Sequence, residues 1–151
     1  MNKQYYNYEE FIQDINTFTI KLQNQKIDTI VGIARGGLTL SHFLAIKLNI
    51  KNVQSINAVS YDNQIHKELT ITNIPNIAEN QTILLVDDIS DSGKTFTQVV
   101  KKLKLKNINI NIVTLSIFYK KTSSFKPDIY LHQNTNWVEF FWEYNKIQTQ
   151  N

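Results

Sequence analysis

Residues 82–100, with the sequence TILLVDDISDSGKTFTQVV, constrain the fold more than any other stretch of the chain. An apolar run typical of a buried strand leads into a polar segment, and a helical pattern follows at once. The same succession occurs at residues 28–48, where DTIVGIA precedes RGG and then LTLSHFLAIKL. Strands that alternate with helices predict a parallel sheet, because parallel neighbours need a crossover connection. The sequence therefore predicts an α/β fold, with a mostly parallel sheet flanked by helices.

The remaining segments extend this pattern. Apolar residues recur at helical spacing over residues 8–22, which predicts an amphipathic helix. Further strands are expected at residues 52–61, 67–72, 110–120 and 128–131, with a polar loop at residues 62–66. No linker, repeat or low-complexity segment interrupts the 151 residues, a length suited to one core. We therefore expect one domain covering residues 1–151.

Composition excludes several kinds of site. The chain has no cysteine, so it has no disulfide, no thiolate metal site and no cysteine nucleophile. Its three histidines, His42, His66 and His132, match no metal-ligand spacing. The start of the chain does not resemble a signal peptide, and no apolar run approaches the roughly 18 residues that a membrane span needs. A cytoplasmic protein without a transmembrane segment is expected.

The charge of the chain says less about its partners. The formal net charge is +3 and the pI is near 9.0, which suits anionic small molecules and nucleic acid alike. The densest basic run, residues 101–107, falls at the expected end of a helix, where lysines interact favourably with the macrodipole. Because this run lacks the interleaved aromatic residues that stack on bases, no nucleic-acid partner is expected.

The polar segment after the strand at residues 82–88 is expected to bind phosphate. It resembles an ATP-binding loop only in part, because Asp88 stands where the pattern G-x-x-x-x-G-K-[ST] requires a glycine. Residues 91–95 nonetheless join a strand to a helix, where free backbone N–H groups and the helix dipole favour an anion. Hydroxyl groups, a permissive backbone and a positive charge come from Ser92, Gly93, Lys94 and Thr95.

Three carboxylates, Asp87, Asp88 and Asp91, lie at the start of this segment. Beside a phosphate they would repel the ligand unless they bind its hydroxyl groups or a shared cation. Asp87 and Asp88 therefore suit the 2- and 3-hydroxyls of a ribose, or a Mg²⁺ ion held by both. The alternative is structural: Asp87 would end the strand, Asp88 would face solvent and Asp91 would cap the helix. Three carboxylates so close to Ser92 favour the ligand-binding interpretation.

The stretch ILLVDDISDSGKTF, residues 83–96, resembles the phosphoribosyl-pyrophosphate (PRPP) motif of type I phosphoribosyltransferases. Independently, VGIARGGLTLSHFLA, residues 31–45, resembles the pyrophosphate loop of that family. The resemblance implies that PRPP is bound by Ala34, Arg35, Gly36 and Gly37 as well as by the acidic and phosphate-binding residues. It also implies a Mg²⁺ cofactor, contact of Arg35 with pyrophosphate and, commonly, a cis peptide bond before this arginine. An ordinary Gly-Gly turn is the alternative for Arg35.

Within the family the chain is most similar to bacterial xanthine-guanine phosphoribosyltransferases, over nearly its whole length. SYDNQIHKELTI, residues 60–71, resembles their mobile loop, which closes over PRPP. FYKKTSS, residues 118–124, and NTNWVEFFWE, residues 134–143, resemble their base-binding segments. The resemblance implies a small C-terminal hood at roughly residues 120–151. It assigns catalytic roles to Arg35, Ser60, Tyr61 and Asp91.

The resemblance further implies how a 6-oxopurine would bind. Lys120 would donate a hydrogen bond to O6, Trp137 would stack on the ring, and Asp91 would act at N7 as general base or acid. The backbone carbonyl of Val138 and the side chain of Glu143 would surround the 2-position edge of the base. The alternatives are core packing for both tryptophans of the hood and a solvated side chain for Lys120.

Together these resemblances imply a purine-salvage enzyme. It would transfer 5-phosphoribosyl from PRPP to N9 of guanine, xanthine or hypoxanthine in a Mg²⁺-dependent reaction, as a homo-oligomer of two or four chains. Two alternatives stay open. One is a hypoxanthine-preferring transferase, because hypoxanthine-guanine enzymes often carry a lysine where this chain has Lys94. The other is a non-catalytic regulator that senses PRPP.

Overall fold

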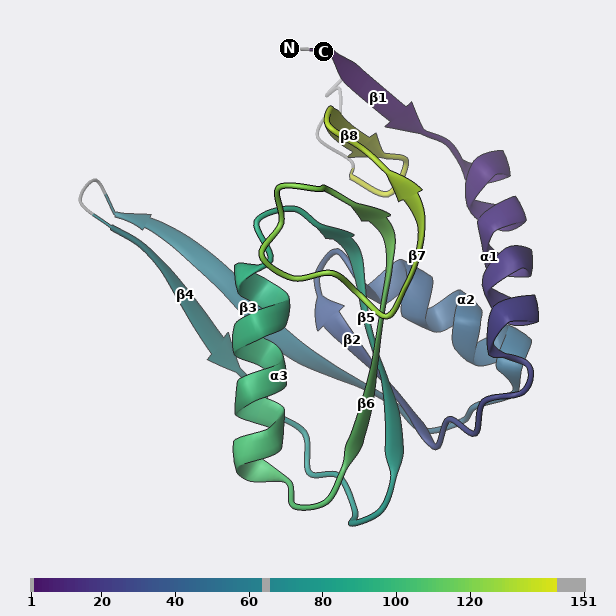
Figure 1. Ribbon diagram of the computed structural model, residues 1–151, viewed down its shortest axis with the longest axis vertical. Helices are drawn as coiled ribbons and strands as arrows, with labels where there is room; N and C mark the ends of the chain where they lie inside the picture. Colours follow the sequence, from purple (N-terminus) through teal and green to yellow (C-terminus); the bar gives the residue numbers. More distant parts are fainter. Residues whose placement is uncertain (1, 64–65, 144–151) are drawn as a thin grey trace, which may run out of the picture.

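The computed structural model describes residues 2–63 and 66–143 (Figure 1). A six-stranded sheet forms the central layer, in the spatial order β4-β3-β2-β5-β6-β7. Its strands are β2 (Thr29–Ala34), β3 (Val53–Asn63), β4 (His66–Thr72), β5 (Thr82–Ser90), β6 (Asn111–Tyr119) and β7 (Ile129–Gln133). Neighbouring strands are parallel except for the antiparallel pair β3 and β4. The prediction of an α/β fold with a mostly parallel sheet is confirmed.

Helices cover both faces of this sheet (Figure 1). They are α1 (Tyr8–Leu22), α2 (Leu38–Leu48) and α3 (Lys94–Lys106). Leu84 and Val86 of β5 pack with α1 and α2, whereas Ile83 and Leu85 pack with α3. Burial on both faces explains why this strand is an unbroken apolar run in the sequence. Among the described residues, no helix combines the length and the apolar character needed to cross a membrane.

The β3–β4 hairpin differs from the sequence prediction. The sequence predicts a polar loop at residues 62–66, but β3 continues to Asn63 and β4 begins at His66, so the prediction is wrong at both ends of that loop. Residues 64–65 lie outside the described residues. The antiparallel pairing runs out to the Asn63–His66 pair, because a backbone ladder does not require apolar side chains. The hairpin projects beyond the rest of the sheet (Figure 1).

A second sheet of two strands joins segments from the two ends of the chain (Figure 1). β1 (Lys3–Tyr6) pairs in parallel with β8 (Trp137–Phe140), with Lys3 opposite Trp137 and Tyr6 opposite Phe140. The family resemblance implies a hood around β8, but nothing in the sequence predicts a strand near the N-terminus. Four residues carry too little periodicity to show a strand whose partner lies so far along the chain. We call the β1–β8 pair the hood sheet.

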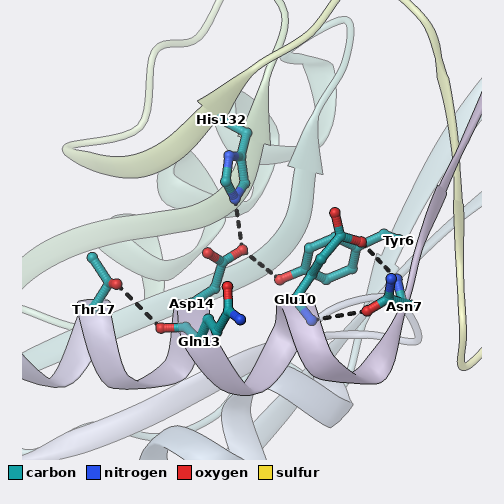
Figure 2. A network of polar contacts seen from close by, with 7 residues as sticks. All are labelled: Tyr6, Asn7, Glu10, Gln13, Asp14, Thr17 and His132. Atoms are coloured by element: carbon teal, nitrogen blue, oxygen red, sulfur yellow. Dashed lines mark hydrogen bonds and ion pairs between the residues drawn. The ribbon is translucent and has the colours of Figure 1, made fainter.

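A partly buried polar network fastens the hood sheet to the rest of the molecule (Figure 2). Tyr6 on β1 donates a hydrogen bond of 2.5 Å to Asp14 on α1, and His132 Nε2 on β7 lies 2.7 Å from the same carboxylate oxygen. The Tyr6 ring packs edge-on against Phe118 and Phe140. Burial, together with the hydrogen bond to Asp14, raises the pKa of Tyr6, and the hydrogen bond to Asp14 raises the pKa of His132. The network therefore links β1 and α1 to β7, which is more than a hundred residues away in the sequence.

Tyr6→Phe removes the hydroxyl that donates a hydrogen bond to Asp14, a residue that is only 8% exposed. Loss of a hydrogen bond to a charged group costs about 1.5–3 kcal/mol, and the free energy of unfolding in urea is expected to fall by that amount. Tyr8→Phe is the matched control, because Tyr8 is 49% exposed and makes no side-chain hydrogen bond within the described part of the chain. If Tyr6→Phe were as stable as wild type, the network would not be holding the hood sheet.

Candidate active site

The loops that follow β2 and β5 meet at one edge of the sheet. The two strands are parallel neighbours, with Gly32 opposite Val86, so the loops after both strands leave the sheet at the same edge. A cavity of about 650 Å³ opens there. In open α/β sheets, this edge is where ligands bind. The cavity is lined by Ile33, Ala34, Arg35, Gly36, Leu38, Thr39, Ala58, Asp87, Asp88, Thr95, Trp142 and Glu143.

The loop after β2 brings its backbone directly against β5. The peptide bond between Ala34 and Arg35 is cis, which confirms the expectation from the resemblance. A side chain at Gly36 would collide with the Asp88 carboxylate, and one at Gly37 would collide with the backbone of β5. Glycine is therefore required at position 37, where the clash is with backbone, and a larger residue at position 36 would have to displace the Asp88 carboxylate. Arg35 is exposed and lines this cavity.

Asp87 and Asp88 form a buried acidic pair near the end of β5. The residues are 9% and 8% exposed, and the Asp88 N–H donates a hydrogen bond of 2.9 Å to the Asp87 carboxylate. Burial, followed by the charge of Asp88, raises the pKa of Asp87 well above its usual range. Burial also raises the pKa of Asp88 to about 6, with a smaller contribution from the charge of Glu143. The alternative in which Asp88 faces solvent is therefore wrong.

The acidic pair fits a divalent cation. None of the ion pairs formed by the described residues involves Asp87 or Asp88, so these carboxylates have no side-chain cation to offset their charge there. Carboxylate oxygens are ligands that Mg²⁺ prefers. Over residues 2–63 and 66–143, no cluster of three acidic or histidine side chains could enclose a metal ion. A Mg²⁺ ion held by this pair would therefore take further oxygens from a bound ligand.

A smaller cavity of about 200 Å³ lies at the start of α3. Gly93 is the N-cap residue, with a φ of 85° that glycine adopts easily, so the alternative in which Asp91 caps the helix is wrong. Ser92, Gly93 and Thr95 line the cavity together with the three carboxylate residues Asp87, Asp88 and Asp91, and the N–H groups of the first helical turn have no helical acceptors. Lys94 is exposed and does not line it. We call residues 91–95 the phosphate loop, because this geometry suits an anion.

The end of β6 brings Lys120 to the phosphate loop. Lys120 Nζ lies 2.8 Å from a carboxylate oxygen of Asp91, and the two side chains are 17% and 55% exposed, respectively. The alternative of a freely solvated Lys120 is therefore wrong. The residues expected at the O6 and N7 positions of a purine lie side by side in the fold.

The segment that follows β8 contributes Trp142 and Glu143 to the larger cavity, whereas Trp137 of β8 does not line it. Trp142 stacks on Phe140, with ring centroids 4.8 Å apart, and Glu143 accepts a hydrogen bond of 3.2 Å from the Phe140 N–H. Trp137 begins β8, is 51% exposed and lines neither of the two cavities. Val138 is buried in the hood sheet. The aromatic side chain that already faces the cavity is therefore Trp142.

Ser60 and Tyr61 are not brought into either cavity. Both lie exposed on β3, towards the tip of the hairpin. The residue of β3 that lines the larger cavity is Ala58, which the sequence analysis missed, as it missed Thr39. Thr39 closely follows the Gly-Gly turn, so that motif could have been extended to include it. Ala58 carries no comparable signal, because only the register of the sheet brings it to the cavity.

Comparison with known proteins gives a consistent result. A family model described as the phosphoribosyl transferase domain matches residues 1–146. The xanthine-guanine phosphoribosyltransferase of Cereibacter sphaeroides is 27% identical over 119 residues, which cover 76% of this chain and 68% of that protein. The solved structure of Helicobacter pylori xanthine-guanine-hypoxanthine phosphoribosyltransferase has a TM-score of 0.87 and 34% identity, covering 94% of each chain. A purine phosphoribosyltransferase from Pyrococcus horikoshii has a TM-score of 0.86 and 30% identity, covering 95% of each chain.

Because the pKa of Asp88 is raised in the folded state, to about 6, the folded protein binds the Asp88 proton more tightly than the unfolded chain does. The free energy of unfolding therefore falls as the pH rises above the unfolded pKa of this carboxyl group. The fall is complete once the pH exceeds the folded pKa. Without divalent cations, Asp88→Asn is therefore expected to be more stable than wild type by on the order of 2 kcal/mol at pH 8, and by much less at pH 4. Urea unfolding in EDTA measures both differences.

Glu79→Gln is the matched control for this experiment, because Glu79 is an exposed carboxylate outside both cavities. It should be as stable as wild type at each pH. An Asp88→Asn protein that gained no stability at pH 8 would contradict the electrostatic cost assigned to the acidic pair.

Proposed function

Because the chain belongs to the phosphoribosyl transferase domain family, we propose that it transfers the 5-phosphoribosyl group of PRPP to N9 of a 6-oxopurine and releases pyrophosphate. It is an enzyme, and the relatives named above are purine phosphoribosyltransferases. The proposed acceptors are guanine, xanthine and hypoxanthine, the proposed cofactor is Mg²⁺, and the proposed role is purine salvage. The main support is that the acidic pair, the phosphate loop and the Asp91–Lys120 ion pair share one edge of the sheet.

In the proposed complex, the larger cavity holds the ribose and the pyrophosphate of PRPP. Asp87 and Asp88 would accept hydrogen bonds from the 2- and 3-hydroxyls. Arg35 and the backbone of residues 34–37 would bind the pyrophosphate, whose negative charge grows as it departs. When bound there, Mg²⁺ would supply further stabilisation of that charge. Because glycosyl transfer has an oxocarbenium-like transition state, stabilising the leaving anion is the main task of these residues.

The phosphate loop would anchor the 5-phosphate of PRPP. Backbone N–H groups at the start of α3 and the hydroxyl groups of Ser92 and Thr95 would donate hydrogen bonds to it. Lys94 would add positive charge from outside the cavity, where its side chain is exposed. Anchoring at this end holds the reacting carbon at a fixed distance from the base, which lowers the entropic part of the barrier.

The Asp91–Lys120 pair would recognise the base. With the two charged groups 2.8 Å apart, a base that takes the Lys120 hydrogen bond at O6 would free the Asp91 carboxylate to accept or return the proton at N7. Trp137, whose side chain is exposed, would stack on the ring of the base. The Val138 carbonyl and Glu143 would meet the 2-position edge. Glu143 already lines the larger cavity, which supports its part in this assignment.

Ser60 and Tyr61 would act only after the β3–β4 hairpin closes over PRPP. Both are exposed, Tyr61 by 57%. Closure would bury them against the ligand and exclude water, which would otherwise hydrolyse PRPP.

We also propose that residues 1–151 form one phosphoribosyltransferase domain with a hood at roughly 120–151, that the enzyme is cytoplasmic, and that it assembles as a dimer or tetramer. Support for the hood comes from Trp142 and Glu143, which reach the larger cavity from that segment. Residues 144–151 of the proposed hood lie outside the described residues. Light scattering on the purified protein measures the number of chains in the assembly.

The purified protein, supplied with PRPP and Mg²⁺, is expected to release pyrophosphate when guanine, xanthine or hypoxanthine is added. Adenine and uracil should give no release, because the Lys120 ammonium suits an acceptor at position 6 of a purine. A clear preference for hypoxanthine would favour the hypoxanthine-preferring alternative. Binding of PRPP without release for any base would favour the regulator. Absence of PRPP binding would contradict all three functions.

Asp91→Asn is expected to lower kcat by about 100-fold, because the amide cannot accept or return a proton at N7. The dissociation constant of PRPP should change by less than about threefold, since the phosphate contacts remain. Steady-state kinetics and calorimetry separate these two effects. An Asp91→Asn enzyme with the kcat of wild type would exclude the acid and base role.

A further inference from the structure

The loop at residues 120–125, which follows β6, is hydrogen-bonded to the phosphate loop. Both the N–H and the hydroxyl of Ser124 donate to the Ser92 carbonyl, at 3.0 and 2.9 Å. Next to this contact, the ring of Phe125 stacks on that of Phe96 in α3, with centroids 5.1 Å apart. A Cβ atom at Gly93 would lie 2.7 Å from the Ser124 hydroxyl oxygen. The two loops are therefore packed as closely as their backbones allow.

The direction of the Ser92 carbonyl determines what the next N–H can do. In a trans peptide unit, the carbonyl and the following N–H point to opposite sides. Among the described residues, only the Ala34–Arg35 peptide bond is cis, so the Ser92–Gly93 peptide is trans. Because its carbonyl is turned towards Ser124, the Gly93 N–H is directed away from the 120–125 loop. Gly93 lines the 200 Å³ cavity, and its N–H has no acceptor within residues 66–143 or 2–63.

A flip of this peptide would reverse the electrostatics of the cavity. The carbonyl dipole would then present partial negative charge to a bound phosphate, in place of a donor. Gly93 has a φ of 85° and no Cβ, so it offers little steric resistance to such a flip. Resistance to the flip must therefore come from the groups that hold the Ser92 carbonyl. Among the described residues, these are the N–H and the hydroxyl of Ser124.

We propose that Ser124 is a positioning residue for the 5-phosphate of PRPP: it holds the Ser92 carbonyl away from the phosphate cavity so that the Gly93 N–H can bind the anion. The inference rests on the proposed function, because it assumes that a phosphorylated ribose occupies this cavity. Ser124 itself need not touch the ligand. Its effect is on the phosphate end of PRPP alone.

The base-binding residue of the same loop is held by other contacts. The Lys120 N–H donates to the Ser90 carbonyl at 3.1 Å, and the Lys120 carbonyl accepts from the Ser123 N–H at 2.9 Å. The Ser90 hydroxyl also donates to the Phe125 carbonyl at 2.7 Å. Removing the Ser124 hydroxyl therefore leaves Lys120 in place. Phosphate binding and base binding should respond differently to a change at Ser124.

The test compares Ser124→Ala, Ser124→Thr and Thr122→Ala with wild type. Calorimetry with ribose 5-phosphate probes the phosphate loop, and calorimetry with pyrophosphate and Mg²⁺ probes the other end of the site. Ser124→Ala should raise the dissociation constant of ribose 5-phosphate by about 3- to 10-fold, the range for one hydrogen bond, and that of pyrophosphate by less than about twofold. Ser124→Thr keeps the hydroxyl and should restore the affinity.

Thr122→Ala is the matched control, because it removes an exposed hydroxyl from the same loop that makes no hydrogen bond to the described residues. It should leave both affinities unchanged. In turnover assays, Ser124→Ala should raise the KM for PRPP by the same 3- to 10-fold factor as above, with kcat and the KM for the purine within about twofold of wild type.

Equal binding of ribose 5-phosphate by wild type and Ser124→Ala would overturn the inference. So would equal weakening of both ligands, which would indicate a general loss of structure, or a wild-type protein that does not bind ribose 5-phosphate. Failure of the proposed function looks different, since it is the absence of pyrophosphate release with every purine. If the affinity for ribose 5-phosphate falls in Ser124→Ala as expected and yet wild type releases no pyrophosphate with any purine, the reaction would be rejected and the positioning role kept.

Discussion

The parallel pairing of β2 with β5 is the constraint on which the rest of the structure depends. Because the two strands run in the same direction with Gly32 opposite Val86, the loops that leave them must occupy the same edge of the sheet. Gly37 then lets one loop lie against the backbone of the other strand at a distance that any side chain would prevent, and Gly36 lies against the Asp88 carboxylate. The cavity, the acidic pair and the start of α3 are all consequences of this single register.

The same arrangement places two carboxylates at the site that no side-chain cation of the described residues pairs with. Asp87 and Asp88 are buried beside each other, and burial, with a smaller contribution from neighbouring carboxylates, raises their pKa values. Asp91, which has Lys120 at 2.8 Å, is balanced within the protein. The folded protein therefore already contains the unfavourable free energy of two neighbouring buried carboxylates, as preorganised sites do. A cation or a hydroxyl donor would be attracted to the acidic pair first.

Local patterns in the sequence could predict the parts of this protein that depend on neighbouring residues. The apolar run ending at Val86, the glycines at positions 36 and 37 and the helix after Gly93 each carry their own signal, and the fold has them where expected. β1 and the cavity face of Trp142 could not be predicted in this way. Their places depend on partners more than a hundred residues distant in one case and on side-chain packing in the other.

The hood sheet depends on both ends of the described chain. β1 is synthesised first, but its partner β8 begins only at Trp137, so a growing chain must keep a short strand unpaired until almost all of its length has been made. A chain interrupted before Trp137 would therefore leave the backbone groups of β1 without their partners in β8, and the larger cavity without Trp142 and Glu143.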